Sequence, residues 1–356
     1  MRVAVISPFS AGPRRGNITT VDRIVRSLEQ LGAELLVMPV DAVPRADMLT
    51  HLKEFEADII HGFHARYCGD TARQLARSMD IPYLLTITGS DISDPVLRSH
   101  PDTADAISSA AVVACFDNHE AGLVATCFPE AVNRVVLVPQ GVEPPPVTGG
   151  MPDGVPDDAL VLLLPAALRP VKNIEFPLRA LLPLAEAHPQ LLLVIAGGVI
   201  DRAYADRVQK ILSRTPFARW LGEVPYGQMG DLYARADIVL NCSRFEGMPN
   251  SLMEAMALGR PVLAVDIPGN RSLVREGETG LLFHGAESFR RQLLRLIHNP
   301  QLRTRCAGNA REHMLTAFPP MREAKQYLSL YQRVLRDTNG ALSETRSARI
   351  QPENSR

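Results

Sequence analysis

The length and composition of the chain indicate a globular protein with two domains. It has 356 residues, of which 46% are hydrophobic and 22% are charged. One hydrophobic core rarely serves a chain of this length, so two domains are expected. The five cysteines are odd in number and none lies in a C-x-x-C pair. That pattern argues against a disulfide framework or a zinc site and favours reduced cysteines in a cytoplasmic protein.

Targeting and membrane signals are not expected in this sequence. The first ten residues, MRVAVISPFS, carry one positive charge and pass into a strand-like run without the apolar stretch of a signal peptide. The longest nearly apolar run, residues 159–168, is much shorter than the ~20 residues of a membrane helix. We therefore expect no transmembrane segment, while peripheral membrane contact stays open.

The two halves of the chain differ in charge. Residues 1–150 hold 12 Lys and Arg against 18 Asp and Glu, and the remainder holds 26 against 21. A basic second half suits an anionic ligand there, whereas the acidic first half argues against nucleic acid as a partner. A random scatter of surface charge would explain the difference equally well.

Strand-like runs alternate with helical stretches along residues 1–142. The strands expected there are 3–7, 34–40, 58–61, 83–86, 111–115 and 135–138. A helix is expected over 20–31, where apolar residues recur at helical spacing. Continuous apolar strands joined by helices are typical of a parallel sheet that is covered on both faces.

The same pattern restarts after a break. Residues 143–158 are rich in proline and glycine and have no periodicity, which predicts a linker. Further strands are expected at 160–164, 191–196, 220–221, 238–241 and 262–265, within a second domain at 159–318. A last helix is expected at 319–336, and the polar, aperiodic residues 337–356 are predicted to be disordered. The chain thus reads as two Rossmann-like, doubly wound α/β domains, with a ligand cleft at the carboxyl ends of their strands.

Common nucleotide motifs are missing from this α/β pattern. Neither half contains G-x-G-x-x-G or the P-loop G-x-x-x-x-G-K-[ST], which counts against dehydrogenases, kinases and ATPases. In the first loop, Gly12 and Gly16 flank a basic pair, and Asn17 or Thr19 could cap the helix that follows. Such a loop can approach a phosphate, but it can also be an ordinary strand-to-helix turn.

A segment of the second half carries two glutamates beside a helix start. In NCSRFEGMPNSLMEAMALGRPVLA, residues 241–264, Glu246 lies in the loop after a strand and Glu254 lies within the next helix. Backbone N–H groups in the first turn of that helix are free, and the helix dipole is positive there. Carboxylates accept hydrogen bonds from sugar hydroxyls, while amides bind anionic oxygens.

A second segment, LRPVKN at 168–173, places two cations after the first strand of the second domain. Arg169 and Lys172 would form a diphosphate clamp if both reach the ligand cleft. Alone they could be two solvated surface charges. Beside the glutamate segment, the clamp is the preferred interpretation.

These segments resemble the glycosyltransferase 4 group. Residues 241–264 look like its E-x7-E motif, and the order LRPVKN, LGEVPYGQMGDLYARADIVLN, FEGMPNSLMEAMALGRPVLAVDIPGNRSLVREGETGLLF is similar to its donor domain over about residues 160–285. The compact RPVK form resembles the glycosyltransferase 1 domain-containing type. In the first half, RRGNITT, HGFHARYCG and LTITGSD resemble selenosugar synthases more weakly. The resemblance implies a GT-B fold, with the last helix crossing back onto the first domain.

The resemblance also implies roles for individual residues. Arg169 and Lys172 would hold the donor diphosphate, Glu254 the nucleotide ribose, and Glu246 the transferred sugar. Further donor-side residues would be Gly16 near the phosphates, Glu223 and Val224 near the base, and Gly247, Met248, Pro249, Asn250 and Ser251 around the sugar.

One departure from the family pattern concerns the acceptor side. Many relatives read T-x-H-G-x-D after the fourth strand, and here threonine, Thr88, stands where that histidine would be. This puts a histidine-assisted mechanism in doubt. His61 and His64 remain in the expected cleft region, and Asn17, His64, Thr88 and Asp91 are the predicted acceptor-side residues. His64 could equally be a structural histidine.

The resemblance implies a retaining hexosyltransferase that uses a nucleotide-sugar co-substrate and no other cofactor. UDP-sugars are the favoured donors, and the acceptor is a small molecule or glycan. No D-x-D motif occurs, so metal-independent transfer is expected, with the two cations supplying the charge. Two alternatives stay open: transfer to a selenophosphate-type acceptor, and a GT-B epimerase or nucleotide-sugar binding module.

Overall fold

The computed structural model describes residues 1–10, 16–150 and 155–348, with side chains described up to residue 338. Its internal contacts divide these residues into two units. Unit 1 comprises 1–10, 24–139 and 321 onward, and unit 2 comprises 16–23, 140–150 and 155–320. The predicted donor domain, 159–318, falls within unit 2, but residues 16–23 also belong to unit 2 rather than to the predicted first domain.

Unit 1 is built on a parallel sheet in the order β2-β1-β3-β4-β5-β6. Its strands are β1 (Arg2–Ser7), β2 (Glu34–Pro39), β3 (Ile59–Phe63), β4 (Tyr83–Thr86), β5 (Val112–Cys115) and β6 (Val135–Leu137). Its helices are α1 (Gly16–Gln30, whose first part belongs to unit 2), α2 (Arg45–Phe55), η1 (Ala65–Gly69), α3 (Asp70–Met79), α4 (Ser90–Ser93), α5 (Pro95–Arg98), α6 (Pro101–Ser109), α7 (Asn118–Cys127), η2 (Pro129–Arg134) and α16 (Pro320–Ala348).

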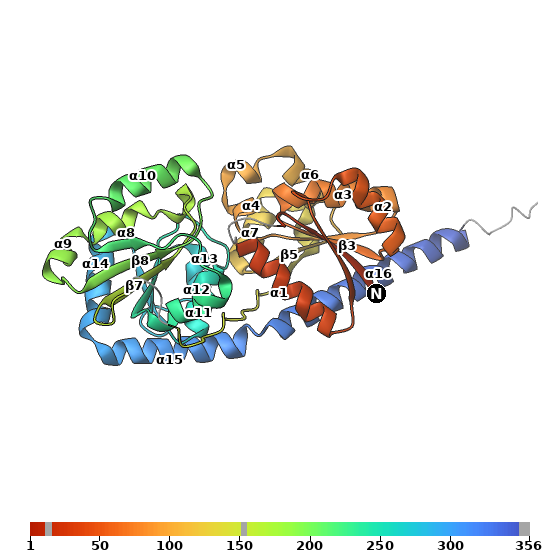
Figure 1. Ribbon diagram of the computed structural model, residues 1–356. Helices are drawn as coiled ribbons and strands as arrows, with labels where there is room; N and C mark the ends of the chain where they lie inside the picture. The colour runs from red at the N-terminus through yellow and green to blue at the C-terminus, as the bar shows by residue number, and fades with distance from the viewer. Residues whose placement is uncertain (11–15, 151–154, 349–356) are drawn as a thin grey trace, which may run out of the picture. The chain divides into compact units, whose positions relative to one another are not determined.

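Unit 2 repeats this architecture with a second parallel sheet, in the order β12-β11-β10-β7-β8-β9. Its strands are β7 (Leu160–Pro165), β8 (Leu191–Ala196), β9 (Ala218–Trp220), β10 (Ile238–Asn241), β11 (Val262–Val265) and β12 (Leu281–Phe283). Its helices are η3 (Pro170–Lys172), α8 (Glu175–Ala180), α9 (Leu182–Ala187), α10 (Arg202–Leu212), α11 (Tyr226–Arg235), α12 (Asn250–Ala257), α13 (Pro268–Arg271), α14 (Gly285–His298) and α15 (Pro300–Ala317). In each unit, helices lie on both faces of the sheet (Figure 1).

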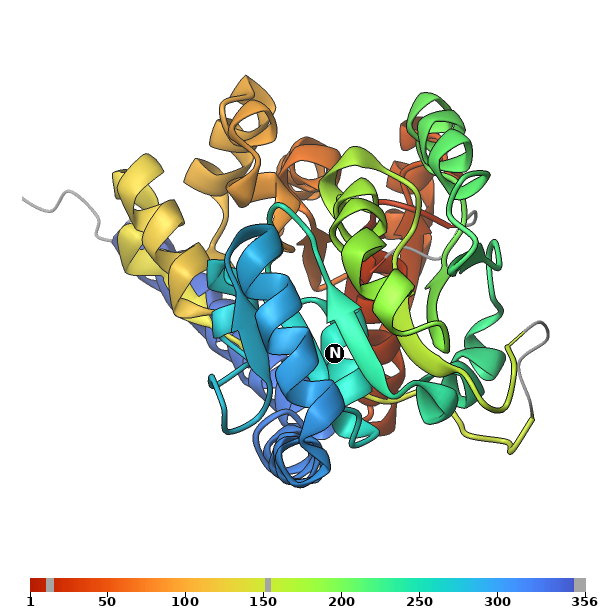
Figure 2. The same cartoon turned by 90° about the vertical axis from the view of Figure 1, so that its left-hand side faces the viewer.

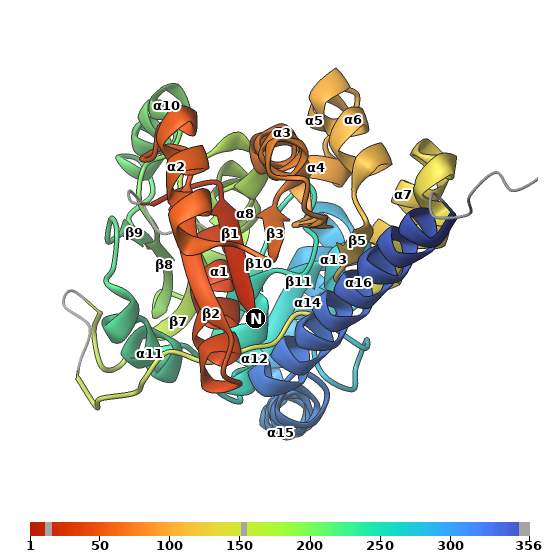
Figure 3. The same cartoon turned by 90° about the vertical axis from the view of Figure 1, so that its right-hand side faces the viewer.

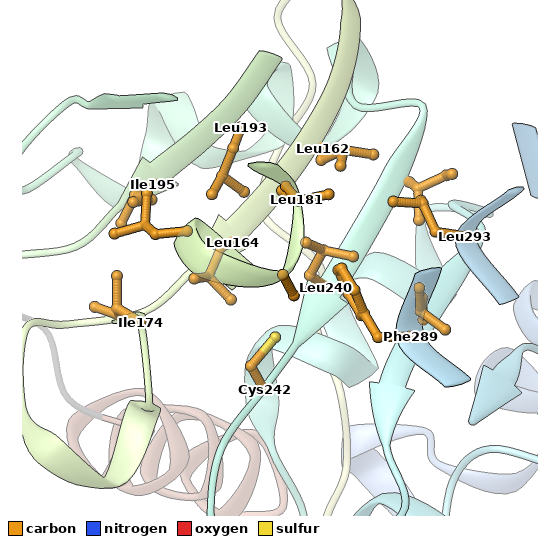
Figure 4. Close-up of a cluster of buried hydrophobic side chains, with 14 of the residues drawn as sticks. Leu162, Leu164, Ile174, Leu181, Leu193, Ile195, Leu240, Cys242, Phe289 and Leu293 are labelled. Carbon is orange, nitrogen blue, oxygen red and sulfur yellow. The ribbon is translucent and has the colours of Figure 1, made fainter. Parts of the chain in front are cut away.

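The sheets form because their strands are apolar on both faces. All six residues of β8, LLLVIA, are buried, as parallel strands require when helices cover both faces. Beneath one face of the unit 2 sheet, leucine and isoleucine side chains from β7, β8 and β10 converge with Phe289 and Leu293 of α14 (Figure 4). Helices α14 and α15, the blue helices of this unit, are seen clearly when the molecule is turned (Figure 2).

Helix α16 is anchored to the unit 1 sheet by a buried polar cluster. His61 Nδ1 lies 2.6 Å from the Tyr331 hydroxyl, and His61 Nε2 lies 2.7 Å from Oγ1 of Thr86. The Tyr327 hydroxyl is 3.1 Å from the same threonine oxygen. Burial lowers the pKa of His61 to about 3, so the imidazole stays neutral. Figure 3 shows α16 as the dark blue helix. His61, which the sequence placed in the cleft region, is fully buried and acts as a structural residue in contact with this helix.

Three other features differ from the sequence prediction. Strand β12 was not predicted, and α16 continues as a helix to Ala348, past residue 337 where disorder was predicted. The first part of the predicted linker is also fixed in place: Asp231 of α11 accepts hydrogen bonds from the backbone N–H of Thr148 (2.8 Å) and Gly149 (2.9 Å). Residues 151–154 of the predicted linker, residues 349–356 of the predicted tail and Gly12 lie outside the described residues.

No helix within the described ranges combines the length and the apolar character needed to cross a bilayer.

A buried carboxyl group in unit 1 gives a prediction about pH. Glu120 of α7 is fully buried, and its Oε2 accepts a 2.9 Å hydrogen bond from the Phe116 N–H, while Oε1 has no hydrogen-bond partner among the described residues. Burial, with a smaller contribution from Asp117, raises the pKa of Glu120 well above its ordinary value. The protonated form therefore stabilises the fold below the unfolded-state pKa, and this stabilisation is lost as pH rises towards the folded-state pKa.

We expect Glu120→Gln to mimic the protonated carboxyl group, so that the stability of the variant does not fall as pH rises. Between the two pKa values, the free energy of unfolding of the wild type should fall relative to that of the variant by about 1.4 kcal/mol per pH unit. Urea unfolding at pH 5, 6.5 and 8 measures the difference. The exposed Glu54→Gln is the control, and a difference that does not change with pH would contradict the prediction.

Candidate functional site

The candidate site lies in unit 2, where the strand order reverses. The first strand of the unit, β7, pairs with β8 on one side and with β10 on the other. Loops that leave the carboxyl ends of β7 and β10 therefore diverge to opposite sides of the sheet, which is where open α/β sheets bind ligands. The loop after β7 contains Arg169 and Lys172, and the loop after β10 contains Glu246.

An ion pair joins these two loops. Lys172 Nζ lies 2.5 Å from Glu246 Oε1, and the two side chains are only 16% and 13% exposed. The backbones of the two loops are also in contact, because the Arg244 N–H donates a 2.8 Å hydrogen bond to the Val171 carbonyl. The structure thus brings together the cation and the carboxylate that the sequence singled out separately.

Burial and charge act in opposite directions on the two partners. Burial would raise the pKa of Glu246, but the charge and hydrogen bond of Lys172, the Ser243 hydroxyl and the charge of Arg169 bring that pKa below its ordinary value. For Lys172, burial and the nearby Arg169 outweigh the attraction of Glu246, so the pKa of the ammonium group is lowered. The ionised form of Glu246 is therefore stabilised by the positive charges of Lys172 and Arg169.

The loop that carries Glu246 rests directly on the start of α13. A Cβ atom on Gly269 would lie 2.0 Å from the carbonyl oxygen of Gly247 and 2.3 Å from that of Glu246, so only glycine fits there. The next residue, Asn270, is fully buried and donates to the Val265 carbonyl at 2.8 Å. The turn after β11 therefore sets the position of the Glu246–Gly247 peptide.

The second glutamate of the motif is held by a tyrosine. Glu254 is 8% exposed, on α12, and its Oε2 accepts a 2.8 Å hydrogen bond from the hydroxyl of Tyr233 on α11. The same hydroxyl lies 3.2 Å from the Ser251 carbonyl. Tyr233 is fully buried, and burial followed by the charge of Glu254 raises its pKa well above the ordinary value, so it remains a donor.

The N-termini of two helices meet at this site. Asn250 begins α12 and Gly16 begins α1, and the Asn250 Nδ2 group donates to the Gly16 carbonyl at 3.0 Å. Both belong to unit 2. Each helix N-terminus presents free N–H groups and partial positive charge. Their approach therefore creates a site that favours an anion.

The other predicted donor-side residues are placed around these elements. Met248 and Pro249 are buried in the loop before α12, and Ser251 is half-buried in its first turn. Glu223 is exposed and Val224 is half-buried in the loop after β9. That loop is joined to the loop after β8, because the Gly197 N–H donates to the Gly222 carbonyl at 2.8 Å.

The predicted acceptor-side residues do not form a comparable group. Asp91 is fully buried, and its carboxylate accepts from the N–H groups of Ala65 (2.8 Å) and Thr88 (3.0 Å). His64 is also fully buried and has a positive φ of 75°. Its Nδ1 accepts from the Tyr67 N–H at 3.3 Å.

These contacts are those of residues that shape the backbone. Asn17 lies in the first turn of α1 and belongs to unit 2, whereas the other three residues belong to unit 1. A role for His64 or Asp91 at the acceptor stays a prediction that their burial does not favour. Thr88 is half-buried as a residue, but its hydroxyl oxygen is buried and has no hydrogen-bond partner among the described residues.

Several residues of the site were not predicted from the sequence. Tyr233 orients Glu254, and the Ser243 hydroxyl hydrogen-bonds to Glu246. The Asn241 side chain accepts from the Ser243 N–H at 3.2 Å. The polar run NCS at the end of an apolar strand is the signal that could have found the last two, whereas Tyr233 looks like an ordinary core position of an amphipathic helix.

Comparison with known proteins agrees with this geometry. Residues 152–313 match the family model described as "Glycosyl transferases group 1". "Glycosyltransferase 1 domain-containing protein 1" of Xenopus tropicalis is 26% identical over 312 residues, which cover 84% of this chain and 89% of that protein. A "D-inositol 3-phosphate glycosyltransferase" of Thermomonospora curvata is 31% identical over 174 residues, 46% of this chain and 40% of that protein.

Solved structures share the fold. Sucrose-phosphate synthase from Thermosynechococcus elongatus superposes with a TM-score of 0.79 at 18% identity, covering 94% of this chain and 99% of that one. Anabaena HepE, in complex with UDP-glucose, gives a TM-score of 0.74 at 17% identity, covering 94% and 100%. Both parallel six-stranded sheets of this chain therefore belong to a GT-B architecture. The donor-side motifs at the switch point of the second sheet lie within the residues that match the glycosyl transferases group 1 family model, and the chain is a glycosyltransferase.

Proposed function

We propose that this protein is a retaining glycosyltransferase that moves a hexose-type sugar from a nucleoside-diphosphate donor to an acceptor hydroxyl, without a metal ion. The observation that carries the proposal is the Lys172–Glu246 ion pair, which joins the loops after β7 and β10 at the switch point of the unit 2 sheet. A cation suited to phosphate and a carboxylate suited to sugar hydroxyls are thereby held side by side.

The donor diphosphate fits the positive side of this site. Arg169 and Lys172 provide two cations, and the N-termini of α1 and α12 add partial positive charge nearby. Burial lowers the pKa of the Lys172 ammonium group, and an anion beside this group would stabilise its charged form. A diphosphate is the natural partner for this combination of charges.

The sugar and the ribose fit the carboxylates. Glu254, which is hydrogen-bonded to Tyr233, would accept hydrogen bonds from the ribose hydroxyls. Glu246 would accept hydrogen bonds from the transferred sugar, and the backbone N–H groups of residues 247–251 would donate to it. The loop at Glu223 and Val224 would face the base. UDP is the favoured nucleotide, in keeping with the UDP and UDP-glucose complexes of HepE.

Retention requires no covalent intermediate on this chain. In the proposed step, the bond between the anomeric carbon and the leaving phosphate oxygen breaks while a bond to the acceptor oxygen forms on the same face. The acceptor proton passes to the leaving phosphate oxygen. Arg169, Lys172 and the start of α12 would stabilise the negative charge that develops on the diphosphate, and such electrostatic stabilisation is usually the largest contribution to catalysis.

The test is a thermal-shift and hydrolysis panel of UDP-, GDP- and ADP-sugars in the presence of EDTA, with Glu254→Ala beside the wild type. We expect one nucleotide family to stabilise the wild type, and the variant to lose that stabilisation. NMR of the released sugar, recorded before it equilibrates, should show the donor's anomeric configuration.

Each part of the proposal has its own contrary result. Activity that EDTA abolishes and magnesium restores would refute metal independence, and an inverted anomer would refute retention. Nucleotide-sugar binding without turnover would identify a binding module, and a free epimerised nucleotide sugar would identify an epimerase. No stabilisation by any donor would refute the proposed site.

A further inference from the structure

A closed ring of buried side-chain hydrogen bonds lies where α1 meets α12. Asn250 Nδ2 donates to Thr20 Oγ1 (3.0 Å), Thr20 Oγ1 donates to Gln140 Oε1 (3.2 Å), and Gln140 Nε2 donates to Asn250 Oδ1 (2.9 Å). Thr20 is 2% exposed and Gln140 is 1% exposed. The ring is complete because every link pairs one donor with one acceptor, which only a hydroxyl and two carboxamides satisfy here.

The ring connects three segments that are far apart in the sequence. Thr20 lies on α1, Asn250 starts α12, and Gln140 is the residue at which the chain enters unit 2 for the second time. Gln140 also donates to the carbonyl of Met248, in the loop that precedes α12, at 3.2 Å. Hydrogen bonds among buried side chains thus connect three segments: the first turn of α1, the loop that contains Met248, and the start of α12.

This arrangement gives the Asn250 side chain a role in addition to the one predicted for the backbone of residues 247–251. Its Nδ2 group is engaged by Gly16 and Thr20, and its Oδ1 by Gln140 and, at 3.4 Å, by Arg23. A side chain so engaged is not available to grip a sugar hydroxyl. The Asn250 side chain fixes the position of Gly16, the exposed first residue of α1, beside the start of α12.

We propose that Thr20, Gln140 and Asn250 form a polar latch that positions the N-terminus of α1 for donor diphosphate binding. This proposal rests on the proposed function, because the latch matters only if both helix N-termini contact the same anion, the donor diphosphate. Two helix N-termini repel each other when no anion lies between them. The latch holds them together in the free protein, so that less ordering remains to be done when the donor binds. Thr20, Gln140 and Asn250 are therefore positioning residues that act through the backbone of Gly16 and Met248.

Thr20→Val tests the latch, because valine keeps the shape of threonine and removes only the hydroxyl. The ring then opens at two links, leaving Gln140 Oε1 and one Asn250 N–H without that partner. Thr20→Ser restores a hydroxyl and should restore the ring. Thr215→Val is the matched control: Thr215 is also a buried threonine of unit 2, at 4% exposure, and its hydroxyl donates to the Ile211 carbonyl at 2.8 Å, outside the latch.

The probe is whichever of UDP, GDP and ADP binds the wild type most tightly by calorimetry. We expect Thr20→Val to weaken that binding by about tenfold, the equivalent of one net hydrogen bond, and to raise the KM for donor hydrolysis more than it lowers kcat. Thr20→Ser and Thr215→Val should bind as the wild type does. Unchanged binding by Thr20→Val, or equal weakening by Thr215→Val, would overturn the latch while leaving the donor site intact. A wild type that binds none of the three nucleotides would overturn the proposed function and the latch with it.

Discussion

Replacing Lys172 by methionine is expected to reduce donor hydrolysis by about 10²–10³-fold, because the variant loses a positive charge that would stabilise the leaving diphosphate. The change also leaves Glu246 as a mostly buried carboxylate without its 2.5 Å partner. Breaking a buried pair in this way costs about 3–5 kcal/mol of stability. The measurement is release of nucleoside diphosphate without added acceptor, beside urea unfolding of the same preparations.

The double variant Lys172→Met, Glu246→Gln separates the two effects. Removing both charges also removes the unpaired carboxylate, so much of the lost stability should return. Activity should not return, since the charge facing the diphosphate is still missing. The exposed Lys210→Ala, on α10 of the same unit, is the control for loss of a lysine and should behave as wild type. Recovery of activity in the double variant would show that Lys172 serves only to neutralise Glu246.

Gly269→Ala is expected to impair the site, although Gly269 is not itself a predicted donor-binding residue. The added Cβ would lie 2.0 Å from the Gly247 carbonyl oxygen, and both neighbouring atoms are backbone that cannot rotate away. The Glu246–Gly247 peptide or the start of α13 must therefore move. A shift of about 1 Å near a reacting centre can lower the rate by about 10²-fold, and overpacking of this kind costs about 1–3 kcal/mol of stability.

A second glycine in the same unit provides the comparison. Gly227 lies in α11, and a Cβ there would meet no atom within 4 Å. Gly227→Ala should keep full activity and gain about 0.5–1 kcal/mol of stability, because alanine is the better helix residue. Donor hydrolysis measured well below the unfolding temperature of both variants distinguishes a displaced loop from a partly unfolded protein. Wild-type activity in Gly269→Ala would mean that the loop adjusts freely.

The acceptor side has less support than the donor side. The carboxylate of Asp91 is engaged by backbone N–H groups, and His64 is fully buried. Thr88 is the remaining unit 1 candidate among the residues predicted there.

The sequence alone determined the fold class and the position of the donor motifs. Continuous apolar runs such as those of β1 and β8 bury both faces, and that pattern is local enough to be recognised without coordinates. The loops after β7 and β10 were found because each follows a recognisable strand: the first carries Arg169 and Lys172, and the second carries Glu246 beside Gly247. Strand β12, Leu281–Phe283, was not predicted from the sequence.

Only the tertiary structure decided how the motif residues are used. The sequence separates Asn250 from Gly16 and Thr20 by more than two hundred positions, and nothing in its own surroundings shows that its amide is engaged by both. The burial of His64, the packing of Gly269 on a peptide bond and the contact of Tyr233 with Glu254 likewise depend on segments that meet only in the folded chain. Local patterns report which face of an element is buried, whereas the partner that buries it is set by long-range packing.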